Sequence, residues 1–329
     1  MVITEKLKQR FVKDTGLPIK IFEEPYFSHY LNLYEEHFQA MTKWRQFQEL
    51  LTHFANEQDY FEEYNRIKDA AIRYFEENSA MQYFCQKEDM NKFKCCNTGY
   101  PGNGIFKETN VGKHFVSIDM IKANFTALRH YDPEIVGGVE TYEDFIGMFT
   151  QYDYIKKSKY IRQVIFGNQN PKRQTTYEKY LMNQILTDIF YYTQISPTKV
   201  AYFGTDEIVL DISDYVTDDE DDNNDAISAF MKNLNVALDK NREKGINVRN
   251  EYFKLYRIKG TAGYLKVFTF TSCGKNHDFK CLDALEMPFV IRYLNDEAYT
   301  EEDMVFVYEG RMARFLEGLT VEITDIPIC

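Results

Sequence analysis

The chain has 329 residues and a formal net charge of −12, and 44% of its residues are hydrophobic and 16% aromatic. This apolar content excludes a disordered protein, and the charge argues against a protein that coats nucleic acid through its overall charge. No apolar run approaches the roughly 20 residues that span a bilayer. The N-terminus, "MVITEKLKQRF", is charged, and reduced thiols are the default for the six cysteines, so we expect a cytoplasmic protein without a membrane partner.

Residues 1–92 are expected to form a helical subdomain. In "YFSHYLNLYEEHFQAM" and "QDYFEEYNRIKDAAIRYF", aromatic and aliphatic residues recur at steps of three and four, which predicts amphipathic helices. We interpret these aromatic stripes as core rather than as platforms for base stacking. A stretch rich in glycine follows, "KCCNTGYPGNGIFKETNVGKH", and residues 93–112 are expected to be a linker.

Two short β segments bracket a second helical region at 141–195. In the first, "FVSID", an apolar strand ends at Asp119. The second, "KVAYFGTDEIVLDIS", holds two acids between apolar runs, with Ile208, Leu210 and Ile212 on one side by alternation. Asp206 and Glu207 therefore lie at a hairpin turn, or where a strand swerves.

The remaining chain alternates between helical and β patterns. "AISAFMKNLNVALDKNREKG" predicts a helix, and "EYFKLYRIKGTAGYLKVFTFTSC" predicts strands around Gly260 and Gly263. "MVFVYEGRMARFLEGL" predicts a strand, a turn at Gly310 and a short helix. We expect one domain with inserted helices over 113–266, and a C-terminal α+β extension over 267–329.

Asp119 and Asp206 are separated by 87 positions that include helical segments. If their strands lie side by side in one sheet, the two carboxylates converge at one edge. Convergent carboxylates suit magnesium ions, and a pair of such ions catalyses in-line phosphoryl transfer. Each acid also has an ordinary interpretation, because Asp is common in hairpin turns and at helix caps.

Three stretches resemble the palm domain of template-directed nucleic-acid polymerases. "FVSIDMIKANFTALR" resembles motif A, and "YFGTDEIVLDI" resembles motif C. The second is most similar to the His-Asp-Glu hairpin of the family A DNA polymerases, with Thr205 in place of His. "KYIRQVIFGNQN" is similar to the motif B helix but lacks its usual Lys. The resemblance implies an α+β fold in which a polymerase-like palm, a small antiparallel sheet backed by helices, follows a helical thumb-like subdomain.

The resemblance also implies roles for single residues. Asp119 and Asp206 would be catalytic and would bind Mg²⁺ or Mn²⁺. Glu207 would support catalysis from beside them, because consecutive strand residues point to opposite faces. Lys159 and Arg162 would meet the phosphates of the nucleotide. Asn124 falls where the sugar 2′ position is sensed, and since family A has Glu there, the choice between DNA and RNA stays open.

The charge of the intervening segment agrees with a nucleotide or template backbone lying near it. Residues 151–200 carry eight Lys or Arg side chains and three acids, in a chain that is acidic as a whole. A solvated helix face is the ordinary alternative.

The sequence thus predicts a nucleotidyltransferase, similar to nucleic-acid polymerases, that acts on a nucleotide triphosphate and a primer or template by two-metal phosphoryl transfer. One alternative is a catalytically inactive polymerase-fold protein with an assembly or regulatory role, which the net charge and the imperfect motif B favour. The other is a metal-dependent nuclease or phosphohydrolase that uses the same carboxylates.

A zinc site is a separate hypothesis. Cys273, His277 and Cys281 offer three ligands, with Cys95 or Cys96 as a fourth. Its alternative is a surface hairpin with free or buried thiols.

Overall fold

A computed structural model describes residues 1–95, 99–216, 223–271 and 276–323, and these residues form an α+β structure. No helix within those ranges is long and apolar enough to cross a membrane. The expected small antiparallel sheet backed by helices is confirmed.

The N-terminal part is helical, as predicted, and its helices use ordinary capping chemistry. Asn56 accepts a hydrogen bond from the backbone N–H of Asp59 at 3.0 Å and so begins the long fifth helix. The buried residues of that helix recur at steps of three and four from Tyr60 to Phe75, so its aromatic stripe is core. The helices are α1 (Glu5–Thr15), α2 (Tyr26–Leu33), α3 (Glu35–Phe38), α4 (Ala40–Leu51), α5 (Glu57–Glu77) and α6 (Ser79–Gln86).

The sheet has six strands within the described ranges, all antiparallel, in the order β2-β3-β1-β4-β5-β6. The strand that contains Asp119, β1, is central, between β3 and β4. The domain boundary expected after Lys266 falls inside β5. Strands β5 and β6 therefore extend the same sheet. The strands are β1 (His114–Met120), β2 (Val200–Phe203), β3 (Glu207–Asp211), β4 (Val248–Arg257), β5 (Tyr264–Thr271) and β6 (His277–Lys280).

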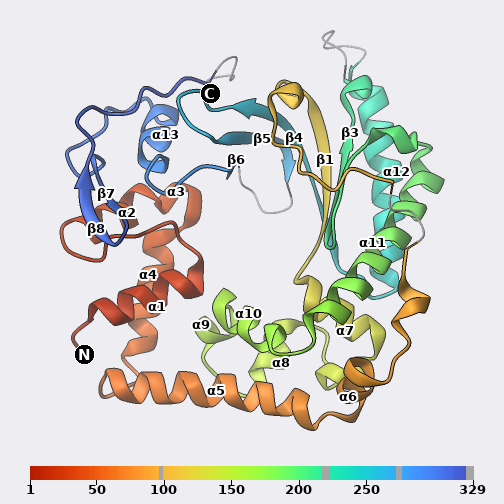
Figure 1. Cartoon of the computed structure of the whole chain (residues 1–329), viewed down its shortest axis with the longest axis horizontal. Helices are drawn as coiled ribbons and strands as arrows, with labels where there is room; N and C mark the ends of the chain where they lie inside the picture. The colour runs from red at the N-terminus through yellow and green to blue at the C-terminus, as the bar shows by residue number, and fades with distance from the viewer. Residues whose placement is uncertain (96–98, 217–222, 272–275, 324–329) are drawn as a thin grey trace.

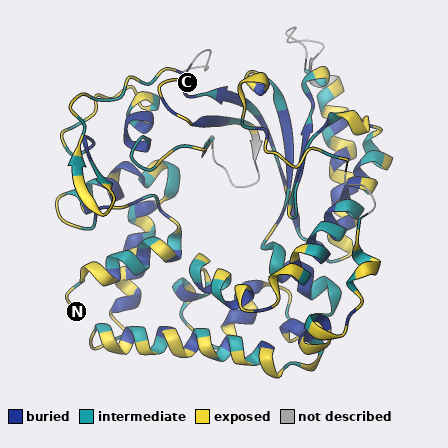
Figure 2. Cartoon of the chain, in the orientation of Figure 1, coloured by how far each residue is buried: buried dark blue, intermediate teal, exposed yellow. Residues whose placement is uncertain are grey.

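The two faces of the sheet differ in what covers them. Ile208, Leu210 and Ile212 lie in the main hydrophobic core, as their alternation predicts, on the side of α11 (Pro171–Thr193) and α12 (Asn223–Glu243) (Figures 1 and 2). Val209 points the other way, into a smaller cluster that Ile105 of the linker helps to form. The sheet is therefore apolar on its helix side and only partly covered on the other.

Short helices connect the strands and fill the lower part of the view in Figure 1. Thr141 caps α8 by accepting a hydrogen bond from the backbone N–H of Asp144 at 3.1 Å. These helices are α7 (Ala123–Tyr131), α8 (Tyr142–Gly147), α9 (Asp153–Lys156) and α10 (Lys159–Gly167). Short 3-10 helices occur at Met90–Phe93, Glu108–Asn110, Pro133–Val136, Pro197–Lys199 and Ser213–Tyr215.

The C-terminal part consists of α13 (Met287–Leu294) and a hairpin of β7 (Val305–Tyr308) and β8 (Arg311–Arg314). The short helix predicted after Gly310 is wrong. Glu309 and Gly310 both have positive φ values, 47° and 76°, and two such residues make the tight turn that joins paired strands.

The N-terminal helix α2 contacts the C-terminal segment around β7, so the elements are arranged in a ring around the centre of the view (Figure 1). His29 Nε2 of α2 lies 2.7 Å from a carboxylate oxygen of Asp303, and Arg292 Nε donates to the other oxygen at 3.0 Å. Nearby, the Tyr30 hydroxyl donates to the carbonyl of Val305 at 2.8 Å. We call His29, Arg292 and Asp303 the terminal clasp.

Candidate functional site

The central strand places Asp119 beside the acidic turn. Asp119 is the register partner of Glu207 across β1 and β3. The backbone N–H of Met120 donates to the carbonyl of Asp206 at 2.8 Å, and Thr205 Oγ1 donates to Asp206 Oδ1 at 3.2 Å. Residues from the two predicted motifs therefore meet at one end of the sheet.

Glu207 has a more central position than its predicted supporting role requires. Residues opposite each other in an antiparallel pair project from the same face, so Glu207 shares a face with Asp119. The alternation argument treated Asp206 and Glu207 as consecutive strand residues. Asp206 instead lies in the turn before β3 and is exposed, so that argument does not apply.

Arg249 of β4 completes the cluster, and no motif pointed to it. It is the register partner of Asp119 on the other side of β1. Its Nε donates to Asp119 Oδ2 at 2.8 Å, and its Nη2 lies 2.7 Å from the same oxygen. Asp119 thus has a counter-ion supplied by its own sheet.

This end of the sheet forms a charged cavity of about 220 Å³, which we call the charged face. Lys266 is buried there, and its Nζ lies 3.9 Å from a carboxylate oxygen of Glu207 and 3.8 Å from one of Glu251. Burial lowers the pKa of Lys266, and the charge of Glu207 opposes this effect. The residues that line the cavity are Asp119, Glu207, Arg249, Glu251, Lys266, Phe268, Asp278 and Lys280.

The carboxylates of this face are held close enough to perturb one another. Burial raises the pKa of Asp119, Arg249 acts against this rise, and the negative charge of Asp206 adds to it. Burial also raises the pKa of Glu207, and Lys266 acts against that rise. A cation at this position would stabilise the ionised forms of both groups.

Asn124 is not free to meet a ligand in this structure. Its Nδ2 donates to Oε1 of Glu178 on α11 at 2.7 Å. Glu178 is buried, and burial, followed by the charge of Asp206, raises its pKa to about 7. Sequence analysis missed Glu178, because a single acid within a helical pattern carries no motif.

Lys159 and Arg162, the two residues predicted to bind phosphate, both lie on α10 but contact different parts of the structure. The guanidinium of Arg162 lies 5.9 Å from the ring centroid of Tyr142, and the ammonium of Lys122 lies 5.5 Å from that same centroid. Lys122 follows Asp119 by three residues and has a φ of 49°. Lys159 instead packs against Gly16 after α1, where an added Cβ would come within 3.4 Å of its side chain. Arg162, rather than Lys159, therefore shares its surroundings with the motif A segment.

The donor set near Asp119 matches one class of metal. Among the described residues no group of three His, Cys, Asp or Glu side chains is arranged to hold an ion. Asp119 and Asp206 nevertheless supply two carboxylates, which is the usual protein contribution to a magnesium site that phosphate oxygens and water complete. Arg249 holds Oδ2 of Asp119, so a metal ion that bound through that oxygen would have to displace the guanidinium.

Among the residues that the structure describes, no set of zinc ligands is brought together. Cys273 and Cys96 lie outside the described residues. His277 neighbours His37, with their ring centroids 6.3 Å apart, and Cys281 is exposed.

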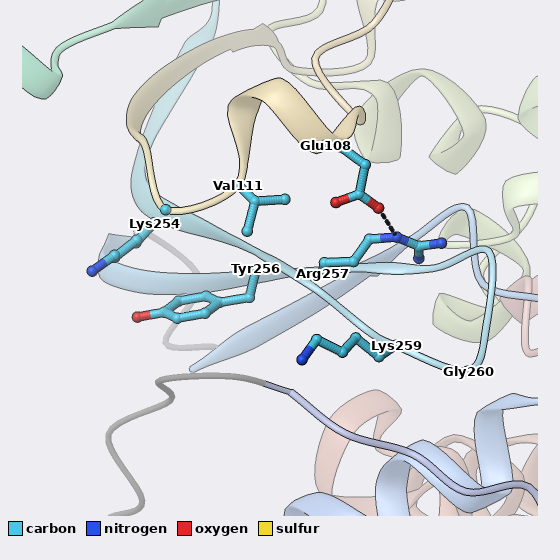
Figure 3. Close-up of a pocket in the computed structure, with 8 residues that line it drawn as sticks. Glu108, Val111, Lys254, Tyr256, Arg257, Lys259 and Gly260 are labelled. Atoms are coloured by element: carbon cyan, nitrogen blue, oxygen red, sulfur yellow. Dashed lines mark hydrogen bonds and ion pairs between the residues drawn. The ribbon is translucent and has the colours of Figure 1, made fainter.

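A larger cavity, of about 460 Å³, lies at the opposite end of β4 and contains none of the predicted site residues (Figure 3). Arg257 points toward Glu108 there, with its Nε donating to Oε1 at 2.7 Å. The same guanidinium also donates to the carbonyls of Thr261 and Gly263 in the β4–β5 turn. Its donors are used to hold the turn, so this cavity does not compete with the charged face as the candidate site.

Comparison of the chain with protein-family models, with curated proteins and with solved structures found no match. The functional argument therefore depends on the geometry and chemistry of the charged face.

Proposed function

We propose that the chain is a nucleotidyltransferase of the polymerase palm type, which acts on a nucleoside triphosphate and the 3′-hydroxyl of a nucleic acid. The observation that carries the proposal is the hydrogen bond from Met120 to the carbonyl of Asp206, together with the pairing of Asp119 and Glu207. Acids from segments 87 positions apart thus lie at the same end of one sheet, and this supports the proposal.

Each nearby residue has a role that its position supports. Asp119 and Asp206 hold the reacting groups in line, and divalent cations bound to them would neutralise phosphate charge and activate the hydroxyl. The hydroxyl oxygen forms a bond to the α-phosphorus, the bond to the pyrophosphate leaving group breaks, and the hydroxyl proton passes to solvent water. Arg162 and Lys122, which approach the same Tyr142 ring, would meet the triphosphate, and Lys122 would leave its ion pair with Glu143 to do so.

The test is nucleotide incorporation on a labelled primer–template with Mg²⁺ or Mn²⁺. Asp206→Asn should abolish incorporation and leave the melting temperature within a few degrees of wild type, because the residue is exposed. Asp296→Asn is the matched control, since Asp296 is also an exposed turn residue and its positive φ of 53° suits Asn. Shortening of the primer by the wild type would indicate a nuclease instead.

A second candidate, an inactive polymerase-fold assembly protein, is favoured by one observation. The guanidinium of Arg249 already occupies Asp119 Oδ2, where a metal ligand is required. If the wild type incorporates no nucleotide on DNA or RNA primer–templates, the enzymatic proposal fails and this candidate replaces it.

A further inference from the structure

We propose that Arg249 competes with divalent cations for Asp119, so that its guanidinium sets how tightly the charged face binds a metal. The inference concerns regulation of the proposed catalytic site, and it rests on the proposed function for the importance of that metal.

The contact is built into the sheet rather than made by a chance surface side chain. Arg249 stands opposite Asp119 in the β1–β4 register, and two of its N–H groups converge on one carboxylate oxygen. A charge-assisted contact of this kind is stronger than a neutral hydrogen bond. A divalent cation that coordinates this oxygen must first displace the guanidinium.

The other cations of the face already have carboxylates of their own. Lys266 lies between Glu207 and Glu251, and Lys280 Nζ lies 2.8 Å from Asp278 Oδ2. Within the described part of the chain, Arg249 is thus the cation that forms an ion pair with Asp119.

The pair is also accessible enough to exchange. The side chains of Arg249 and Asp119 are 43% and 28% exposed, so separating them costs the fold little. Glu251 lies two residues further along the same face of β4 and offers a released guanidinium a second carboxylate. Arg249 can therefore leave Asp119 without unfolding the strand.

The experiment measures Mn²⁺ binding to the full-length protein without nucleotide or nucleic acid, from the electron paramagnetic resonance signal of free Mn²⁺. Arg249→Gln should bind Mn²⁺ about tenfold more tightly than wild type, since loss of a charged hydrogen bond removes the competitor. Arg249→Lys keeps the charge and should bind with nearly wild-type affinity. Arg314→Gln is the matched control. Arg314 lies on the distant β7–β8 hairpin and is paired with Glu301.

The outcomes separate this inference from the proposed function. Equal or weaker Mn²⁺ binding by both Arg249→Gln and Arg249→Met overturns the competition, even if the wild type incorporates nucleotides. Tighter binding that disappears when Asp119→Asn is added supports it, even if no incorporation is seen and the proposed function fails. Absence of Mn²⁺ binding by every variant overturns both.

Discussion

Asn124 on α7 donates a hydrogen bond to Glu178 on α11, and this contact joins the motif A helix to the longest helix behind the sheet. The carboxyl group it holds is buried and lies within the electrostatic influence of Asp206. The position expected to sense the sugar is therefore coupled to a titratable group that no motif predicted.

Glu178 should make stability depend on pH. Its folded-state pKa of about 7 lies above the ordinary value of 4.5, so the folded state binds the proton more tightly. Its stabilising contribution is complete below pH 4.5 and is lost as the pH rises through 7. Glu178→Gln removes this dependence, so between pH 5 and pH 8 the variant should gain roughly 2 kcal/mol relative to wild type.

Urea unfolding at both pH values measures this difference. The exposed Glu243 of α12 provides the control. The free energy of unfolding of Glu243→Gln should change between the two pH values by the same amount as that of wild type. If the unfolding free energies of Glu178→Gln and of wild type changed equally between pH 5 and pH 8, Glu178 would be ionised in the folded state at pH 5.

Lys266 should stabilise the charged face by offsetting its acids. Lys266→Met keeps the volume but leaves Glu207 and Glu251 without their buried cation, so we expect a loss of roughly 2 kcal/mol at pH 8. The loss should shrink at low pH, where the carboxylates are protonated. Chemical denaturation of Lys266→Met and of Lys259→Met, a change at an exposed ion pair, gives the comparison. Equal small effects would contradict the prediction.

The terminal clasp should contribute to global stability. Asp303 is buried and accepts from Arg292 and from the backbone N–H of Thr300, with His29 also in contact. Asp303→Ala leaves Arg292 without its buried partner and should cost about 3 kcal/mol. The neighbouring Glu301, largely exposed in its pair with Arg314, should cost below about 1 kcal/mol when changed to Ala. Thermal unfolding of both variants would contradict the clasp if their melting temperatures matched.

Two glycines allow backbone strain to be separated from steric contact. Gly260 and Gly310 have φ values of 82° and 76°, so either change to Ala incurs the left-handed penalty of roughly 1 kcal/mol. At Gly260 an added Cβ would also lie 2.3 Å from the carbonyl oxygen of Thr320, whereas Gly310 faces open space. Gly260→Ala should therefore be clearly the less stable variant by denaturant midpoint, and equal midpoints would argue against the close approach.

Local patterns in the sequence predicted the parts of the fold that depend on neighbouring residues. The spacing of aromatic residues predicted that one side of α5 is buried. Alternation predicted that Ile208 and Leu210 point into the core. The strand after Gly310 was predicted as a helix, because "ARFLEGL" contains good helix formers, while the strand pairing depends on a turn of two residues with positive φ.

The chemistry of the charged face was only half predictable for a different reason. Asp119 and Asp206 carry recognisable neighbours, so their convergence could be expected. Arg249 meets Asp119 because the two residues are opposite each other in the β1–β4 register. Glu178 meets Asn124 because α11 packs against α7. Register and helix packing are long-range properties, and a single sequence without a motif does not display them.

The terminal clasp has a consequence for how the protein is made. His29 is synthesised 274 residues before Asp303, so the N-terminal helices complete their contacts only after Asp303 has left the ribosome. Until then a tyrosine-rich surface around Tyr30 and Tyr34 stays uncovered, and such surfaces are prone to aggregate. Closure over so long a stretch of chain is also slow. Production of this protein should therefore benefit from added chaperones, which cover this surface until the clasp forms.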